Sequence, residues 1–251
     1  LDLGCGNGDF LIYLKKQGYN PTGITFSDNQ ASEIKIRDST LDVIVHDYRK
    51  KNKNLEKRFD AISALGTFEH VYNGNPNSLY YKKEIKREFE KMFNIHKTWI
   101  DPESKNKRIF STTLHYNTNK DIITHPNIYH NERMGGIAYP FIDENLGKYL
   151  NNTGWRLESE EDMTIHYYLA SKLNEKHFGA PSKITPLKIL LTCIALPLYP
   201  LAYSILYTSS IAGSWMWQFD GKNHKSIHDC TFEKDDNKRP VTLYWHVGRL
   251  D

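Results

Sequence analysis

Three glycines at alternate positions near the start of the chain, Gly4, Gly6 and Gly8, form the most informative group of residues in the sequence. They follow a short apolar stretch that contains Asp2 and precede a helix-like stretch. Glycine tolerates positive φ and has no Cβ, so a flat, polar ligand can lie directly against the backbone of such a turn. The spacing differs from the G-x-G-x-x-G of a dinucleotide site. A strand–turn–helix corner without a ligand is the structural alternative.

The D-x-G-x-G-x-G run resembles the first motif of class I methyltransferases, which bind S-adenosyl-L-methionine (SAM). Later blocks extend the resemblance: they read GITFSDNQ (23–30), HDYR (46–49), FDAI (59–62) and FEHV (68–71). In order and spacing these blocks resemble the cyclopropane fatty acid synthase family, including the mycolic acid cyclopropane synthases. The resemblance is dense over residues 1–71 and patchy beyond them.

This resemblance implies that SAM is the cofactor. The residues that it assigns to SAM binding are Asp2, Gly4, Gly6, Gly8, Thr25, Ser27, Gln30, Asp47 and Tyr48. Thr25 and Gln30 would hold the ribose and nearby atoms, whereas Asp47 and Tyr48 would lie at the adenine. A carboxylate for the ribose usually ends the second strand of a class I methyltransferase, and Thr25 and Ser27 stand there instead, as in the cyclopropane group.

The resemblance also implies a catalytic centre in which a bicarbonate ion lies beside the SAM methyl group. Its ligands in the family include a glutamate, a histidine and a tyrosine, which correspond here to Glu69, His115 and Tyr167. A further ligand, a cysteine, precedes the first motif in the family and lies outside this sequence. Each residue has a structural alternative: a carboxylate at a helix start, a histidine at a strand end, or one of 16 tyrosines.

The chemistry of such a centre is specific. Methyl transfer to an unactivated alkene leaves a carbocation, which closes to a ring when a base removes a proton from the added methyl group. A buried ion held by hydrogen-bonding groups can be that base, and the site must exclude water that would trap the cation. The carboxyl ends of strands in an open α/β sheet are where such a site is expected.

Three functions remain open on the sequence. The first is a SAM-dependent methyltransferase that acts on unsaturated fatty acyl chains of phospholipids and forms a cyclopropane or a methyl branch. The second is a small-molecule amine N-methyltransferase on the same scaffold, in which Glu69 and His70 would orient and deprotonate the amine. The third is a non-catalytic, lipid-associated SAM-binding protein, because a family cysteine near the lid is replaced by Ile211 and neighbouring motifs are altered.

The order of the elements that must position these residues predicts an α/β fold with a doubly covered sheet. We expect a class I methyltransferase, Rossmann-like fold: a mostly parallel seven-stranded sheet with an antiparallel last strand and an apolar insertion before it. The predicted strands are 1–3, 21–25, 41–46, 59–65, 108–115, 155–163 and 241–247. The predicted helices are 8–17, 28–37, 79–95 and 143–152, with an exposed loop at 97–108. We expect one domain over residues 1–251, with the insertion at about 179–220.

The stretch Ile189–Phe219 contains no charged residue over 31 positions, which is long enough to span a membrane. Pro197 and Pro200 interrupt it, and the final strand must return to the sheet, so a single crossing is disfavoured. We expect a bent, interfacial or re-entrant element. An apolar hairpin packed in the core or lining an acyl pocket is the alternative.

Composition sets broader limits. The net charge of +3 offers no basic stripe, so nucleic acid is not an expected partner. The three cysteines show no disulfide framework or zinc spacing, and no metal is expected at His224, His228 and Cys230. We therefore expect a cytoplasmic protein, peripheral at the membrane, with a phospholipid or fatty acyl substrate. The oligomeric state is open, with a homodimer among the options. Leu1 lies inside a predicted strand, so we expect that an N-terminal segment precedes it.

Overall fold

The computed structural model describes residues 1–72, 80–116, 146–167, 169–170, 194 and 241–251. The chain divides into two compact units, one of residues 1–162 and 243–251 and the other of residues 163–242. The predicted apolar insertion at 179–220 falls within the second range, and apart from Ile194 it lies outside the described residues. None of the described helices is long and apolar enough to cross a membrane.

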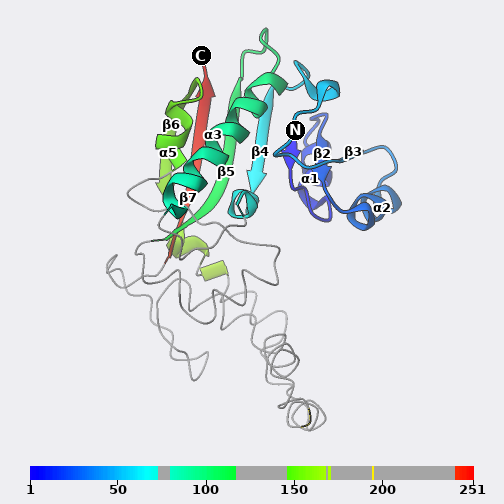
Figure 1. Cartoon of the computed structure of the whole chain (residues 1–251). Coiled ribbons are helices and arrows are strands. Elements are labelled where there is room, and N and C mark those ends of the chain that lie inside the picture. The colour runs from blue at the N-terminus through cyan, green and yellow to red at the C-terminus, as the bar shows by residue number, and fades with distance from the viewer. Residues whose placement is uncertain (73–79, 117–145, 168, 171–193, 195–240) are drawn as a thin grey trace. The chain divides into compact units, whose positions relative to one another are not determined.

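The first unit is built on a seven-stranded sheet in the order β3-β2-β1-β4-β5-β7-β6 (Figure 1). Its strands are β1 (Asp2–Leu3), β2 (Thr22–Thr25), β3 (Asp42–Val45), β4 (Ala61–Leu65), β5 (Arg108–Tyr116), β6 (Trp155–Asp162) and β7 (Val241–Leu250). The pairs among β1 to β5 are parallel, and β6 and β7 pair antiparallel. This arrangement confirms the predicted class I methyltransferase fold with an antiparallel last strand.

Helices and short 3-10 turns connect these strands. The helices are α1 (Asp9–Lys16), α2 (Asp28–Arg37), α3 (Tyr81–Trp99) and α5 (Leu146–Asn151), and the turns are η1 (Lys53–Leu55) and η2 (Phe68–His70). α2 begins where predicted because the Ser27 side chain caps it by accepting a hydrogen bond of 3.3 Å from the Gln30 N–H.

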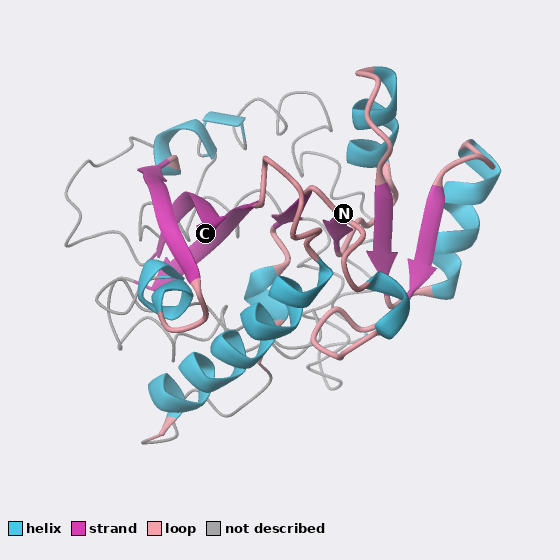
Figure 2. Ribbon diagram, turned by 90° about the horizontal axis from the view of Figure 1, so that it is seen from above, coloured by secondary structure: helices cyan, strands magenta, loops and turns pink. Residues whose placement is uncertain are grey.

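The helices lie alongside the strands (Figure 2), and two clusters of buried apolar side chains hold them there. Under α1 and α2 the cluster contains the buried side chains of Cys5, Leu11, Ile34 and Leu41. Around α3 the core is aromatic, with fully buried rings of Phe68, Phe89, Phe93, Trp99, Tyr149 and Trp155. α5 packs on α3 through Phe89 and Tyr149, whose ring centroids lie 5.2 Å apart.

The end of α3 differs from the prediction. The helix was expected to end near residue 95, with an exposed loop from 97, but it continues to Trp99. His96 and Trp99 are both fully buried and continue the apolar face of the helix by a further turn. The Trp99 carbonyl also accepts a hydrogen bond of 3.1 Å from the Phe59 N–H, which fixes the helix end beside the start of β4.

Candidate cofactor and catalytic site

The glycine loop between β1 and α1 has the geometry of a ligand-binding turn. Gly4, Gly6 and Gly8 have positive φ angles of 66°, 53° and 77°. A Cβ at Gly4 would lie 2.8 Å from Thr67 Oγ1, and one at Gly8 would lie 2.7 Å from Ile34 Cγ1, so these two positions are packed. A Cβ at Gly6 would meet nothing within 4 Å among the described residues. The loop is therefore anchored at both ends and open at its centre, where a ligand can approach the backbone.

At the carboxyl end of β2 the predicted polar residues form one local network. The Thr25 hydroxyl donates a hydrogen bond of 2.6 Å to Gln30 Oε1 and accepts one of 3.1 Å from the Ser27 N–H. The Gln30 amide group is thereby held at the strand end. Phe26, which lies between Thr25 and Ser27 in the sequence, is 76% exposed. Sequence reasoning missed this ring, and its signal was an aromatic residue among polar residues directly after a buried strand.

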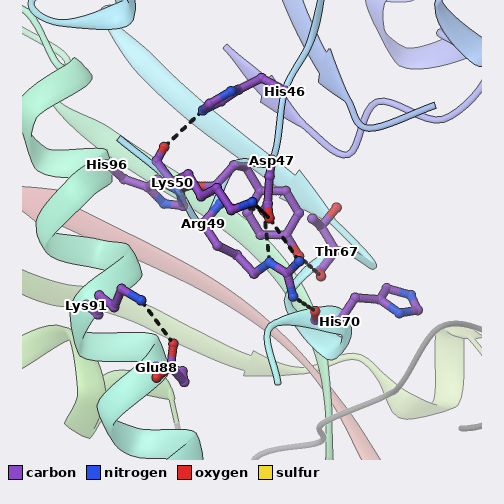
Figure 3. Close-up of polar contacts among 10 residues, drawn as sticks. His46, Asp47, Arg49, Lys50, Thr67, His70, Glu88, Lys91 and His96 are labelled. Carbon is purple, nitrogen blue, oxygen red and sulfur yellow. Dashed lines mark hydrogen bonds and ion pairs between the residues drawn. The ribbon is translucent and has the colours of Figure 1, made fainter. Parts of the chain in front are cut away.

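Asp47 is held by its neighbour (Figure 3). Arg49 grips the carboxylate at both oxygens, with Nε 2.9 Å from Oδ1 and Nη2 3.0 Å from Oδ2. These hydrogen bonds lower the pKa of Asp47, so the carboxylate is ionised. Arg49 also lies 3.5 Å from the backbone carbonyl of His70, which connects the loop after β3 to η2.

Tyr48 points into the protein. Its hydroxyl donates a hydrogen bond of 3.0 Å to the Thr67 carbonyl, and its own carbonyl lies 3.0 Å from His96 Nε2. The side chain is 5% exposed. Asp47 and Tyr48 were both predicted at the adenine, but only Asp47 is partly accessible. Tyr48 instead fixes the loop after β3 to the protein interior through its hydrogen bonds.

Asp2 also has a scaffolding position. It is 4% exposed and accepts a hydrogen bond of 2.7 Å from the Ser63 hydroxyl on β4. Burial raises the pKa of Asp2 to about 6. The carboxyl group therefore joins the two central strands below the glycine loop.

Glu69 is a buried acid with a raised pKa and one oxygen without a hydrogen-bond partner among the described residues. It is 5% exposed, and its Oε1 accepts a hydrogen bond of 3.0 Å from the Leu114 N–H on β5. Its Oε2 is buried and has no hydrogen-bond partner among the described residues. Burial raises the pKa of Glu69 to about 7. Near neutral pH this carboxyl group can therefore either donate or accept a proton, a property that general acids and bases require.

His115 follows Leu114 at the end of β5 and is fully buried. The structure thus brings two of the three predicted ion ligands, Glu69 and His115, to adjoining positions at the carboxyl ends of β4 and β5. Tyr167 belongs to the second unit, where it is 38% exposed, so its approach to Glu69 stays a prediction. The His70 ring points away from the Arg49–Asp47 pair (Figure 3).

A further glycine, Gly66, was missed by sequence reasoning. It lies directly after β4, has a φ of 60°, and a Cβ there would meet nothing within 4 Å among the described residues. Its N–H donates a hydrogen bond of 2.9 Å to Thr112 Oγ1. Like Gly6, it leaves backbone open at the carboxyl edge of the sheet. The signal was its place two residues before the FEHV block.

Comparison with known proteins agrees with this geometry. Residues 1–95 match a family model described as a methyltransferase domain. N-methyltransferase 4 of Papaver somniferum is 35% identical over 80 residues, which are 29% of this chain and 22% of that protein. Cyclopropane-fatty-acyl-phospholipid synthase of Escherichia coli K12 is 31% identical over 99 residues, which are 38% of this chain and 25% of that protein. The matched stretches thus span about a quarter of these relatives.

Among solved structures, the cyclopropane synthase MmaA2 of Mycobacterium tuberculosis superposes with a TM-score of 0.58 at 15% identity, covering 98% of this chain and 76% of that chain. Geranyl diphosphate C-methyltransferase of Streptomyces coelicolor A3(2) gives a TM-score of 0.59 at 12% identity, covering 100% and 70%. These structures establish the class I methyltransferase fold. Residues 1–95 thus resemble a methyltransferase domain in sequence, and the chain has the class I methyltransferase fold.

Proposed function

We propose that the protein transfers the methyl group of SAM to unsaturated fatty acyl chains of phospholipids, forming a cyclopropane or a methyl branch. The observation that carries the proposal is the Glu69 carboxyl group. It is buried, accepts a hydrogen bond through one oxygen from the N–H of Leu114, the residue before His115, and lacks a partner for the other oxygen among the described residues. A buried carboxyl group of this kind suits a site that excludes water, binds an anion and transfers a proton.

The residues present fit SAM. Gly6 and Gly66 leave open backbone at the sheet edge, the buried Thr25 hydroxyl holds the half-buried Gln30 amide in place, and Phe26 offers an exposed ring. Bound there, SAM would supply an electrophilic methyl group. The chain's part is to orient the cofactor against the backbone, as expected at the carboxyl ends of strands in an open α/β sheet.

The catalytic residues would act on the proton. Attack by an alkene leaves a carbocation, and ring closure requires removal of one proton from the added methyl group. We propose that Glu69, His115 and Tyr167 hold a bicarbonate ion that takes this proton. Because the pKa of Glu69 is about 7, its protonated form can donate a hydrogen bond to the anion. Exclusion of water protects the cation.

A phospholipid substrate implies contact with a bilayer. We propose that the chain is cytoplasmic and peripheral at the membrane, and that the charge-free stretch Ile189–Phe219 serves the lipid substrate. An acyl chain that leaves the bilayer loses about 0.8 kcal/mol per methylene exposed to water. An apolar element near the substrate entrance would reduce that cost.

The second candidate is amine N-methylation, which the 35% identity to the Papaver N-methyltransferase favours. In that reaction Glu69 and His70 would orient and deprotonate the amine, and His115 and Tyr167 need not act together. His115→Asn distinguishes the two: it should abolish a reaction that needs the anion site but leave most of an N-methyltransferase activity.

The test is lipid mass spectrometry of cells that express the full-length gene. We expect acyl chains that gain one CH2 unit, with ring and branch distinguished by hydrogenation. Glu69→Gln should abolish the gain, whereas the exposed control Glu103→Gln should not. Unchanged lipids, together with methylation of an amine by the purified protein, would overturn the proposal in favour of the second candidate. SAM binding without either product would indicate a non-catalytic protein.

A further inference from the structure

A cluster of ionisable and aromatic side chains lies on the last two strands of the sheet, beside His115. Figure 1 shows β7 between β5 and β6. His246 on β7 is 1% exposed, and His115 on β5 is fully buried. Aliphatic side chains usually occupy such positions in the core of a sheet, and burying two imidazoles carries a desolvation cost that needs compensation. The described residues contain no group of three or more side chains arranged to hold a metal ion.

Two rings of β7 enclose the ring of His115. The Tyr244 ring meets it edge-on, at a centroid distance of 5.0 Å and an interplanar angle of 84°. The His246 ring lies 5.2 Å away at 39°. Tyr244 and His246 are two residues apart on one strand, so their side chains lie on the same face of the sheet. Together they restrict the orientation that the His115 ring can adopt.

An acid on β6 lies beside His246. Glu160 and His246 are directly opposite in the antiparallel β6–β7 pair, where opposite charges attract. His246 Nε2 lies 3.2 Å from Glu160 Oε2, close enough for an ion pair when the ring is protonated, although the ring N–H is not aligned for a straight hydrogen bond. The ionisable groups around His246 thus include Glu160 from β6, His115 from β5 and Tyr244 from β7 itself.

We propose that Tyr244 and His246 are positioning residues for His115, and that Glu160 holds His246 in place by its charge. The proposal rests on the proposed function, in which His115 is a ligand of the catalytic anion. A side chain that binds an anion must be held close to its productive orientation, and residues that contact this side chain commonly restrain it. The last strand, remote in sequence from the motifs, thereby becomes part of the catalytic apparatus.

The first test does not depend on activity. Ring resonances of His115 and His246 are followed by NMR in the full chain with labelled histidine, and they are assigned by their loss in His115→Asn and His246→Asn. Glu160→Gln should shift both sets of resonances. The matched control is Glu161→Gln, which makes the same charge change one residue away, at an exposed position opposite Trp245. It should shift neither set.

The second test uses turnover of an unsaturated phospholipid in vesicles. Tyr244→Ala and Glu160→Gln should lower kcat by about 10-fold or more, with SAM affinity and KM little changed, since outer groups of a site commonly matter to this extent. Tyr244→Phe keeps the ring and should restore kcat. A core residue with no positioning role would affect stability but not this split between kcat and KM.

The outcomes separate the two proposals. Unchanged His115 resonances in Glu160→Gln, or equal loss of kcat in Tyr244→Phe and Tyr244→Ala, would overturn the positioning role. Shifted resonances with full kcat in all variants would overturn it as well. If Glu160→Gln shifts the His115 resonances but the wild type methylates no phospholipid, the restraint on His115 is supported and only the proposed function is overturned.

Discussion

The hydroxyl of Tyr48 donates a hydrogen bond of 3.0 Å to the backbone carbonyl of Thr67, and both groups are buried. The Thr67 hydroxyl in turn donates one of 2.7 Å to the Leu3 carbonyl at the start of the glycine loop. Three strand ends, those of β1, β3 and β4, are therefore connected by hydrogen bonds within the protein. These buried hydrogen bonds fix the positions of the loops that form the proposed SAM site.

Removing one hydroxyl tests this connection. Tyr48→Phe leaves the Thr67 carbonyl buried without its partner, which should lower the free energy of unfolding by about 1–3 kcal/mol. Because the loops that it joins would loosen, SAM affinity should fall several-fold. Urea denaturation and calorimetry measure the two effects. The control is Tyr13→Phe, at a residue that is 56% exposed, and it should change neither. Unaltered SAM affinity in a destabilised Tyr48→Phe would limit the connection to stability.

The open face of Gly6 can be tested against a matched glycine. Gly6 and Gly18 both have positive φ, and a Cβ at either would meet nothing within 4 Å among the described residues. Valine at either position should therefore cost similar stability, about 1–2 kcal/mol, from the strained backbone. Gly6→Val should abolish SAM binding, because its side chain would occupy the ligand's space, and Gly18→Val should preserve it. Equal SAM affinities of Gly6→Val and Gly18→Val by calorimetry would contradict the assignment of Gly6 to the SAM site.

Glu69 should leave a signature in the dependence of stability on pH. Its pKa in the folded protein is about 7, above the ordinary value of 4.5, so between these values the folded state holds the proton that the unfolded state releases. The stability of the wild type relative to Glu69→Gln should be greatest below about pH 4.5 and fall by about 3 kcal/mol as the pH rises past 7. A pH-independent difference in urea denaturation would contradict the burial of this acid.

The same substitution separates binding from catalysis. Glu69→Gln preserves the shape of the side chain but cannot exchange its proton, so SAM affinity should stay within about twofold, while turnover falls about 100-fold or more. Parallel loss of affinity and turnover would indicate that Glu69 acts on the cofactor site instead.

His96 should show the opposite dependence on pH. Burial lowers its pKa from 6.5 to about 4, so between these values the unfolded state binds a proton that the folded state does not. Relative to His96→Phe, the wild type should be most stable above about pH 6.5 and lose about 3 kcal/mol as the pH falls through 4. Thermal or urea unfolding across this range measures the slope, and a slope of the other sign would refute the buried neutral imidazole.

The apolar stretch can be tested by charge. Leu198→Asp with Leu201→Asp should reduce binding to phospholipid vesicles while sparing SAM affinity, because two carboxylates oppose insertion into an apolar phase. Ile36→Asp is the control, since Ile36 on α2 is exposed and lies outside this stretch. Vesicle flotation equal in the wild type and the double variant would count against membrane contact through Ile189–Phe219.

Much of the fold was determined by the sequence alone. The alternation of strand-like and helix-like stretches and the alternate glycines are local signals, and they predicted the sheet, the glycine loop and α2, whereas the Ser27 cap was found only in the structure. Glu69 and His115 were predicted from motif resemblance, and the structure places them at adjoining strand ends. The end of α3 was misjudged, because histidine is not apolar by type, and only the burial of His96 in the folded protein makes it part of the helix face that continues to Trp99.

Only the tertiary structure decided which way the site residues face. Nothing local indicates that Tyr48 turns inward to Thr67, that Asp2 bonds to Ser63, or that His246 packs against His115. Each of these contacts depends on which strands become neighbours, and strand order is set by the burial of whole faces of helices and sheet. Short stretches of sequence show which side chains are present, whereas their burial and hydrogen-bond partners, which set their pKa values and orientations, come from residues far apart in the chain.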